Sequence, residues 1–189
     1  MRASQEEKER SRERIVEGAA RLVRERGIEG TSVADVMAAA GMTHGGFYRH
    51  FGSKEELLVS ALEAAFGQML AELDRRLEAD GPEAEAKFGA YYLSQGHVDR
   101  PGAGCPAAAI CSDAGRGSGA LKSAFGAGIS RMAAVLARGM RGPAQARRAS
   151  ALREIAMLAG AVAIARASDP DTARDVLAAC RKPPGNAQP

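Results

Sequence analysis

The chain has 189 residues, of which 46% are hydrophobic and 4% aromatic, and its formal net charge is +3. Abundant alanine with few β-branched and aromatic residues favours an all-α fold and argues against one built on strands. The longest apolar run, Ile155–Ala165, is about half of what a bilayer span needs. Because the charged N-terminus also lacks a signal-peptide core, we expect a cytoplasmic protein with no membrane segment.

Two helices are predicted first in chain order. The first spans about residues 6–26 and ends at Gly27, since glycine is common just after a helix. The second helix is short. Thr31 or Ser32 can cap its start, and Gly41 ends it.

A third, very short helix is predicted between Thr43, its N-terminal cap, and Gly52, which closes it. Together with the second helix it is typical of a helix-turn-helix, whose later helix lies in the DNA major groove. Phe47 and Phe51, four residues apart, are expected to face inward. The other side then carries His44, Gly45, Tyr48 and Arg49. Glycine in a helix costs about 1 kcal/mol against alanine, and here it would let the backbone come close to DNA.

Basic and acidic residues are distributed unevenly. Residues 1–54 carry ten basic and eight acidic residues, 55–114 carry four and eleven, and 115–189 carry twelve and four. The excess of basic over acidic residues in the first segment is small for a nucleic-acid-binding protein. Contacts with DNA would therefore have to come from the local placement of charges and from helix ends.

A long fourth helix is predicted from a capping box of Ser53 and Glu56 to the break at Ala79–Glu83. Turn-like segments separate the helices expected after it, at about 83–97, 106–114, 118–140, 144–167 and 170–181. The chain is thus expected to have three parts: a helix-turn-helix domain at 1–52, a helical ligand-binding and dimerisation domain at 53–182, and a disordered tail at 183–189.

The segment Arg12–Leu62 resembles the N-terminal DNA-binding domain of TetR/AcrR-type transcriptional repressors. It reads RERIVEGAARLVRERGIEGTSVADVMAAAGMTHGGFYRHFGSKEELLVSAL, and GGFYRHFGSKEEL within it matches the most characteristic stretch of that family. The resemblance implies a repressor, not an enzyme, without a cofactor. It would bind a palindromic operator on double-stranded DNA as a homodimer paired through the helices at about 144–167 and 170–181. An unknown small-molecule or electrophile effector would release it.

The resemblance also implies roles for individual residues. The expected phosphate contacts are Thr31 or Ser32, and Thr43. The residues expected to face bases are His44, Gly45 and Gly46. The DNA backbone would be held by Tyr48, His50 and Lys54, and Arg49 could contact either. A basic N-terminal arm could add Arg2, Lys8, Arg10 and Arg12.

A second region of interest holds Cys105 and Cys111. Pro106 at the first helical position places Cys105 at a helix N-cap, where free N–H groups can favour a thiolate. Such a thiol could sense an oxidant or electrophile, as in some similar family members; alternatively, both cysteines are small apolar core residues. Aromatic and methionine residues fall where the family encloses its effector, although such a set can equally form core: Phe88, Tyr91, Tyr92, Met69 and Met132.

Three other readings rest on single features. Cys105 could be an enzymatic nucleophile with His97 as its base, but nothing at a readable spacing supplies an orienting acid or an oxyanion site. An architectural DNA-binding protein without an effector is disfavoured by the acidic middle segment. His44 and His50 have no third ligand nearby, so no metal site is predicted.

Overall fold

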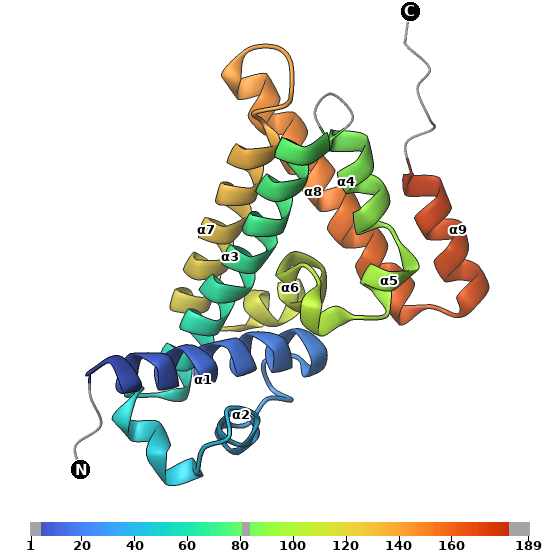
Figure 1. The fold of residues 1–189 in the computed structure, drawn as a ribbon. Helices are drawn as coiled ribbons and strands as arrows, with labels where there is room; N and C mark the ends of the chain where they lie inside the picture. Colours follow the sequence, from blue (N-terminus) through green and yellow to red (C-terminus); the bar gives the residue numbers. More distant parts are fainter. Residues whose placement is uncertain (1–4, 81–83, 182–189) are drawn as a thin grey trace, which may run out of the picture. The chain divides into compact units, whose positions relative to one another are not determined.

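The computed structural model describes residues 5–80 and 84–181, and every regular element within these ranges is helical (Figure 1). The predicted all-α fold is therefore confirmed. Arg2 of the expected arm and the tail at 183–189 lie outside the described residues. In chain order the elements are α1 (Gln5–Arg26), α2 (Val33–Ala39), the 3₁₀-helix η1 (His44–Arg49), α3 (Lys54–Asp80), α4 (Ala84–Tyr92), α5 (Gln95–Val98), the 3₁₀-turn η3 (Pro101–Ala103), α6 (Pro106–Arg116), α7 (Gly119–Leu136), α8 (Ala144–Ala167) and α9 (Pro170–Cys180).

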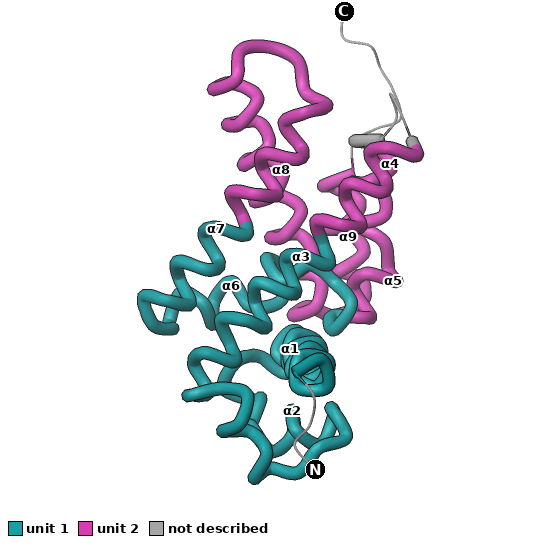
Figure 2. Tube along the Cα trace, turned by 60° about the vertical axis from the view of Figure 1, so that its left-hand side comes forward, with its two compact units in different colours: residues 1–69, 101–128 teal, residues 70–100, 129–189 magenta. Residues whose placement is uncertain are grey.

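The chain forms two compact units, coloured separately in Figure 2. The first contains residues 1–69 and 101–128, and the second contains residues 70–100 and 129–189. Helix α6 therefore belongs to the same unit as α1, α2 and η1, although the second unit interrupts the chain between them. The boundary expected between residues 52 and 53 falls inside the first unit and stays a prediction.

One hydrophobic core joins α1, α2, η1 and the start of α3. Its buried members are Ile15, Ala19, Ala20, Leu22, Val36, Met37, Ala40, Phe47, Phe51, Leu57, Ala61 and Ala65. Each large side chain that leaves water in this way contributes roughly 1.5–3 kcal/mol. The short helices α2 and η1 are too short to be stable alone, so this shared core is what holds them.

Several helix ends agree with the sequence expectations. Gly27 and Gly41 have φ values of +78° and +71° and end α1 and α2. Ser32 caps α2, forming a capping box with Asp35. The box expected from Ser53 and Glu56 forms differently: Ser53 Oγ accepts from the Glu56 N–H, while the Glu56 carboxylate accepts from the Gly52 N–H at 2.8 Å.

The predicted single helix at about 83–97 is wrong. The chain breaks after Tyr92, because Ser94 adopts an extended backbone conformation and its hydroxyl accepts from the His97 N–H, which starts the separate helix α5. The helix expected at 118–140 also ends earlier, at Leu136, where tighter turns follow. None of the described helices combines the length and apolarity that crossing a membrane requires.

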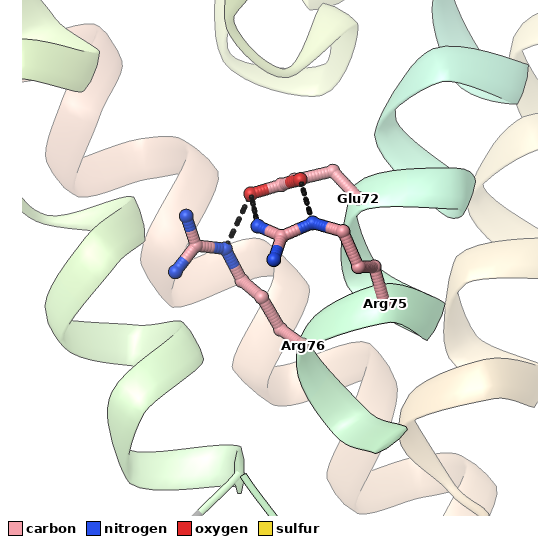
Figure 3. Close-up of polar contacts among 3 residues, drawn as sticks. All are labelled: Glu72, Arg75 and Arg76. Atoms are coloured by element: carbon pink, nitrogen blue, oxygen red, sulfur yellow. Dashed lines mark hydrogen bonds and ion pairs between the residues drawn. The ribbon is translucent and has the colours of Figure 1, made fainter. Parts of the chain in front are cut away.

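In the second unit, polar contacts gather at the end of α3. The Glu72 carboxylate accepts from Arg75 Nε at 2.9 Å and from Arg76 Nε at 2.6 Å (Figure 3). These bonds, led by that from Arg75, lower the pKa of Glu72. The Arg76 guanidinium also lies 3.7 Å from the centroid of the Tyr91 ring, which ties α3 to α4.

His97 is a buried titratable group in the second unit. Its side chain is 4% exposed, its Nδ1 lies 2.6 Å from the Tyr92 carbonyl oxygen, and its own carbonyl accepts from Arg166 at 2.7 Å. Burial lowers the pKa of His97, and the nearby positive charge of Arg166 lowers it further, against the hydrogen bond to Tyr92. The neutral imidazole is therefore the form that fits the fold.

We expect the free energy of unfolding to fall as the pH drops below about 6.5. The folded-state pKa of His97 is lowered, so the unfolded chain binds more protons in this window and acid favours it, by at most ~1.4 kcal/mol per pH unit. Urea unfolding between about pH 5.5 and 7.5 measures this. His97→Gln should flatten the slope more than His50→Gln, because His50 is only half-buried; equal slopes in His97→Gln and wild type would contradict the assignment.

Candidate nucleic-acid interface

The turn between α2 and η1 is set by local hydrogen bonds. The Gly41 N–H donates to the Ala38 carbonyl at 3.0 Å, and the Met42 N–H donates to the Met37 carbonyl at 2.8 Å. This pair of bonds around a residue with positive φ is a Schellman motif, which satisfies the last carbonyls of α2. The chain thereby reverses direction and enters η1 after Thr43.

Two phenylalanines anchor η1 to the core. Phe47 and Phe51 are 1% and 2% exposed, and their rings stack with centroids 5.8 Å apart. The predicted inward orientation of both rings is therefore confirmed. The element is a 3₁₀-helix, held by bonds such as that from the Gly46 N–H to the Thr43 carbonyl at 3.0 Å.

The opposite flank of η1 is open to solvent. Tyr48 is 73% exposed, more than any other large hydrophobic side chain in the described parts of the chain. The predicted DNA contacts that are exposed are Ser32, Thr43, His44, Gly45, Tyr48, Arg49 and Lys54, whereas Gly46 and His50 are half-buried. These residues come from α2, η1 and the first turn of α3 and belong to one unit.

Thr31 differs from its neighbour Ser32. It is 1% exposed, and its hydroxyl donates to the Gly27 carbonyl at 2.8 Å. The sequence offered Thr31 or Ser32 as a helix cap and phosphate contact. The structure makes Ser32 the cap, and the burial of Thr31 argues against a phosphate contact through its hydroxyl. The sequence was ambiguous here because Thr31 and Ser32 are adjacent hydroxyl residues, and either can cap a helix.

Positive side chains gather around His50. Burial is the main cause that lowers the pKa of His50, and the charges of Lys8, Arg49 and Arg12 add to it. The His50 Nδ1 is buried and has no hydrogen-bond partner among the described residues. Three basic side chains that are separated in the sequence thus act on one position at the end of η1.

Arg12, expected in a basic arm, is held by the domain itself. Its guanidinium lies 4.6 Å from the Phe51 ring centroid, 3.4 Å from Ser60 Oγ and 3.7 Å from the Glu56 carboxylate. The side chain therefore ties α1 to the end of η1 and to α3. No local signal in the sequence indicates these contacts, because the partners lie about forty residues away.

The two adjacent glycines of η1 have different surroundings. A Cβ on Gly46 would lie 3.5 Å from Met37 Cε, an ordinary contact with the core, whereas a Cβ on Gly45 would meet no described atom within 4 Å. Neither has a positive φ. The fold itself thus does not require glycine at position 45.

The predicted sensing and effector residues are mostly buried. Cys105 is the N-cap of α6 with Pro106 following, as expected, but it is 0% exposed, while Cys111 is exposed. The other predicted members differ in burial: Phe88, Tyr92, Met69 and Met132 are buried, and Tyr91 is half-buried. No group of three or more metal-ligating side chains occurs in the described parts of the chain.

Three surface cavities are lined by other residues. One of about 610 Å³ in the second unit involves Met140, Arg141, Arg153 and Met157. Two in the first unit, of about 310 and 470 Å³, lie beside Asp113 and beside Arg24. None of them includes the predicted effector residues, whose place in a ligand pocket stays a prediction.

Comparison with known proteins agrees with this geometry. Residues 15–61 match the model of the family described as bacterial regulatory proteins, tetR family. The uncharacterized HTH-type transcriptional regulator Rv0196 of Mycobacterium tuberculosis is 35% identical over 105 residues, which are 55% of this chain and 53% of that protein. The chain thus matches about half the length of this relative.

Solved structures share the fold over most of the chain. A TetR-family transcriptional regulator from Cytophaga hutchinsonii has a TM-score of 0.77 at 23% identity, covering 96% of this chain and 95% of that one. Escherichia coli NemR in its reduced form has a TM-score of 0.74 at 20% identity, covering 91% and 95%. At these identities the likeness concerns the fold alone.

We expect alanine to have opposite effects at two glycines of this region. Gly41→Ala should lower the free energy of unfolding by about 1–2 kcal/mol, because alanine is strained at a positive φ. Gly45→Ala should cost nothing and can add up to about 1 kcal/mol, because the site is helical and open. Urea unfolding of both variants checks this, and an equal loss in both would contradict it.

Proposed function

Because the chain belongs to the TetR family of bacterial regulatory proteins, we propose that it is a homodimeric repressor that reads a palindromic operator with η1. An effector bound among the C-terminal helices would shift the population toward a conformer whose two recognition helices are wrongly spaced for the operator. This family is one of transcriptional regulators rather than enzymes, in agreement with the sequence expectation.

The observation that carries the proposal is the division of η1 into two faces. Phe47 is buried, while His44, Tyr48 and Arg49 are exposed although they lie on the same short helix. Tyrosine is enriched at interfaces, because its ring offers apolar contact area and its hydroxyl can hydrogen-bond. In the groove, His44 would contact base edges, and Tyr48 would donate its hydroxyl to a phosphate.

Gly45 supports the same assignment. Its conformation and packing would tolerate a side chain, and alanine would favour the helix. A glycine that the protein does not need for itself suits a position where another molecule comes close to the backbone. We propose that this molecule is the floor of the DNA major groove.

Phosphate contacts would surround this centre. Thr43 has an exposed hydroxyl that caps nothing through its side chain, and Lys54 is exposed at the start of α3. The Ser32 hydroxyl, by contrast, donates to Asp35 and accepts from its backbone N–H, and the Asp35 carboxylate also accepts from the Ser32 N–H. Thr43 is therefore the better phosphate partner of the two. Lys8 and Arg49, whose charges act on His50, add the positive charge that a phosphate would meet.

Dimerisation is proposed through α8 and α9, which pack against each other in the second unit. Residues spaced three or four apart on α8 are exposed or half-buried and small or apolar: Leu152, Ala156, Gly160, Ala163 and Ala167. A Cβ on Gly160 would meet no described atom within 4 Å, and the adjacent Ile164 is 51% exposed. Such a surface lets a second helix approach closely.

For the effector, the burial of Cys105 favours the interpretation of a core residue over that of a reactive sensor. An electrophile would have to reach a thiol that is 0% exposed. Cys111 is exposed but lies within α6, away from its N-terminal N–H groups. We therefore propose a small molecule bound without covalent chemistry as the effector.

We expect three substitutions on the exposed flank to weaken binding to DNA from the protein's own promoter region. Tyr48→Phe removes one phosphate hydrogen bond and should cost about fivefold in Kd. His44→Ala removes a base contact and should cost about tenfold or more. Gly45→Ala should also cost about tenfold, although it leaves stability intact. Mobility shifts at fixed salt measure all three.

Gly46 was also expected to face bases, but a Cβ there would lie 3.5 Å from Met37 Cε and so would face the core rather than the groove. Gly46→Ala is therefore the matched control. It should bind like wild type. If Tyr48→Phe, His44→Ala and Gly45→Ala all bound with wild-type affinity, the assignment of η1 as the recognition element would be wrong.

We expect Ile164→Glu to convert the dimer into monomers at micromolar concentration, because a charge without a partner in an apolar interface costs about 2–5 kcal/mol. Sedimentation velocity measures the change. Lys122→Glu on α7, an exposed charge outside the proposed interface, is the control and should remain dimeric. If Ile164→Glu remained dimeric with an unchanged Kd for dimer dissociation, the interface would lie elsewhere.

A further inference from the structure

A carboxylate on α6 binds the turn that leads into the helix-turn-helix. Asp113 Oδ2 accepts from the backbone N–H of Ile28 at 2.9 Å, and Asp113 Oδ1 accepts from Arg116 at 2.6 Å. Ile28 is the second residue after the end of α1, and it is buried. A hydrogen bond to an ionised carboxylate is stronger than one between neutral groups. The start of this turn is therefore held from a helix that lies 85 residues away in the chain.

The turn is shaped around this contact. Gly27 has a φ of +78°, and a Cβ there would lie only 2.6 Å from Asp113 Oδ2. Its carbonyl accepts from the Thr31 hydroxyl at 2.8 Å, immediately before Ser32 caps α2. The path from the end of α1 to the start of α2 is thus fixed by Asp113 at one end and by Thr31 at the other.

A second tether lies one turn earlier on α1. Arg24 is 6% exposed and donates to the Gly104 carbonyl at 3.3 Å and to Gln68 Oε1 at 2.7 Å. Gly104 directly precedes the N-cap of α6, so α1 and the turn that follows it contact the two ends of α6. Between the two tethers, Ile110 departs from helical geometry with φ −131° and ψ 17°.

We propose that Asp113 is a positioning residue for DNA binding. Asp113 lies on α6, outside the proposed DNA-binding helices, and its carboxylate fixes the turn that leads into α2. Because α2 packs with η1 in one core, this turn also helps to determine the position of η1. This inference rests on the proposed function, since it concerns how well η1 is presented to DNA. It follows from geometry within one compact unit, which contains α1, α2, η1 and α6.

The experiment compares three variants of the full-length protein. Asp113→Ala removes the acceptor of the Ile28 N–H. Asp113→Asn keeps an oxygen of the same shape without the charge. Arg116→Ala is the matched control, because it removes the partner of the other carboxylate oxygen and leaves the bond to Ile28. For each, mobility shifts on promoter DNA, thermal unfolding and amide hydrogen exchange are measured.

We expect Asp113→Ala to bind DNA about tenfold more weakly at temperatures where it is fully folded. Asp113→Asn should lie between it and wild type, and Arg116→Ala should match wild type. The Ile28 amide should exchange faster in Asp113→Ala while core amides of α3 keep their protection. A residue with only a structural role would lower the unfolding temperature without changing the affinity of the folded protein.

Two results would overturn the inference while leaving the proposed function standing: wild-type affinity in folded Asp113→Ala, or an equal loss in Arg116→Ala. If Asp113→Ala does not fold, Asp113→Asn is the deciding variant. Wild-type DNA affinity in Asp113→Asn, together with faster exchange of the Ile28 amide, would contradict the proposed positioning role of Asp113. Failure of the proposed function is visible separately, because wild type itself would then not bind DNA, and the role of Asp113 in DNA binding would fall with it.

Discussion

The burial of two phenylalanines against α1, α2 and α3 is the constraint on which the candidate site depends. A six-residue 3₁₀-helix has too few hydrogen bonds to persist in water by itself. Phe47 and Phe51 give it a fixed place in the core, and their direction decides that His44, Tyr48 and Arg49 face solvent. The exposed flank that we propose as the recognition surface is thus a consequence of the packing on the other side of η1.

Packing also decides the electrostatics of this surface. Lys8 and Arg12 come from α1 and Arg49 comes from η1, yet the charges of all three act on His50 at the end of η1. Arg12 is further held by the Phe51 ring and by Glu56, so it serves the rigidity of the domain as well as its charge. A modest charge surplus can therefore form a concentrated positive surface, which is what binding a phosphate backbone requires.

The first unit extends beyond the helices that the family model matches. Residues 101–128 belong to it, and α6 is joined to the end of α1 through Arg24 and Asp113. This makes α6 part of the scaffold that carries η1, the proposed recognition helix. A ligand that favoured another position of α6 would consequently act on the turn before α2 directly, without a long chain of intermediate contacts.

The sequence by itself determined the helical fold, the ends of the first two helices and the two faces of η1. These features depend on local rules: glycine at positive φ after a helix, serine at an N-cap, and apolar residues at helical spacing. It could not separate Thr31 from Ser32, because two adjacent hydroxyl residues can each cap a helix and the structure buries one of them. It did not indicate the break at Ser94, because a serine can either continue a helix or cap the next one.

Only the tertiary structure decided which partners distant residues find. Arg12 contacts Ser60, and the Ile28 N–H donates to Asp113, although these partners are far apart in the chain. The burial of Cys105 likewise depends on tertiary packing. No periodic pattern encodes such pairs, because a hydrogen bond or a buried contact depends on where two separate helices meet in space. Local sequence determines the elements and their faces, and packing determines what those faces touch.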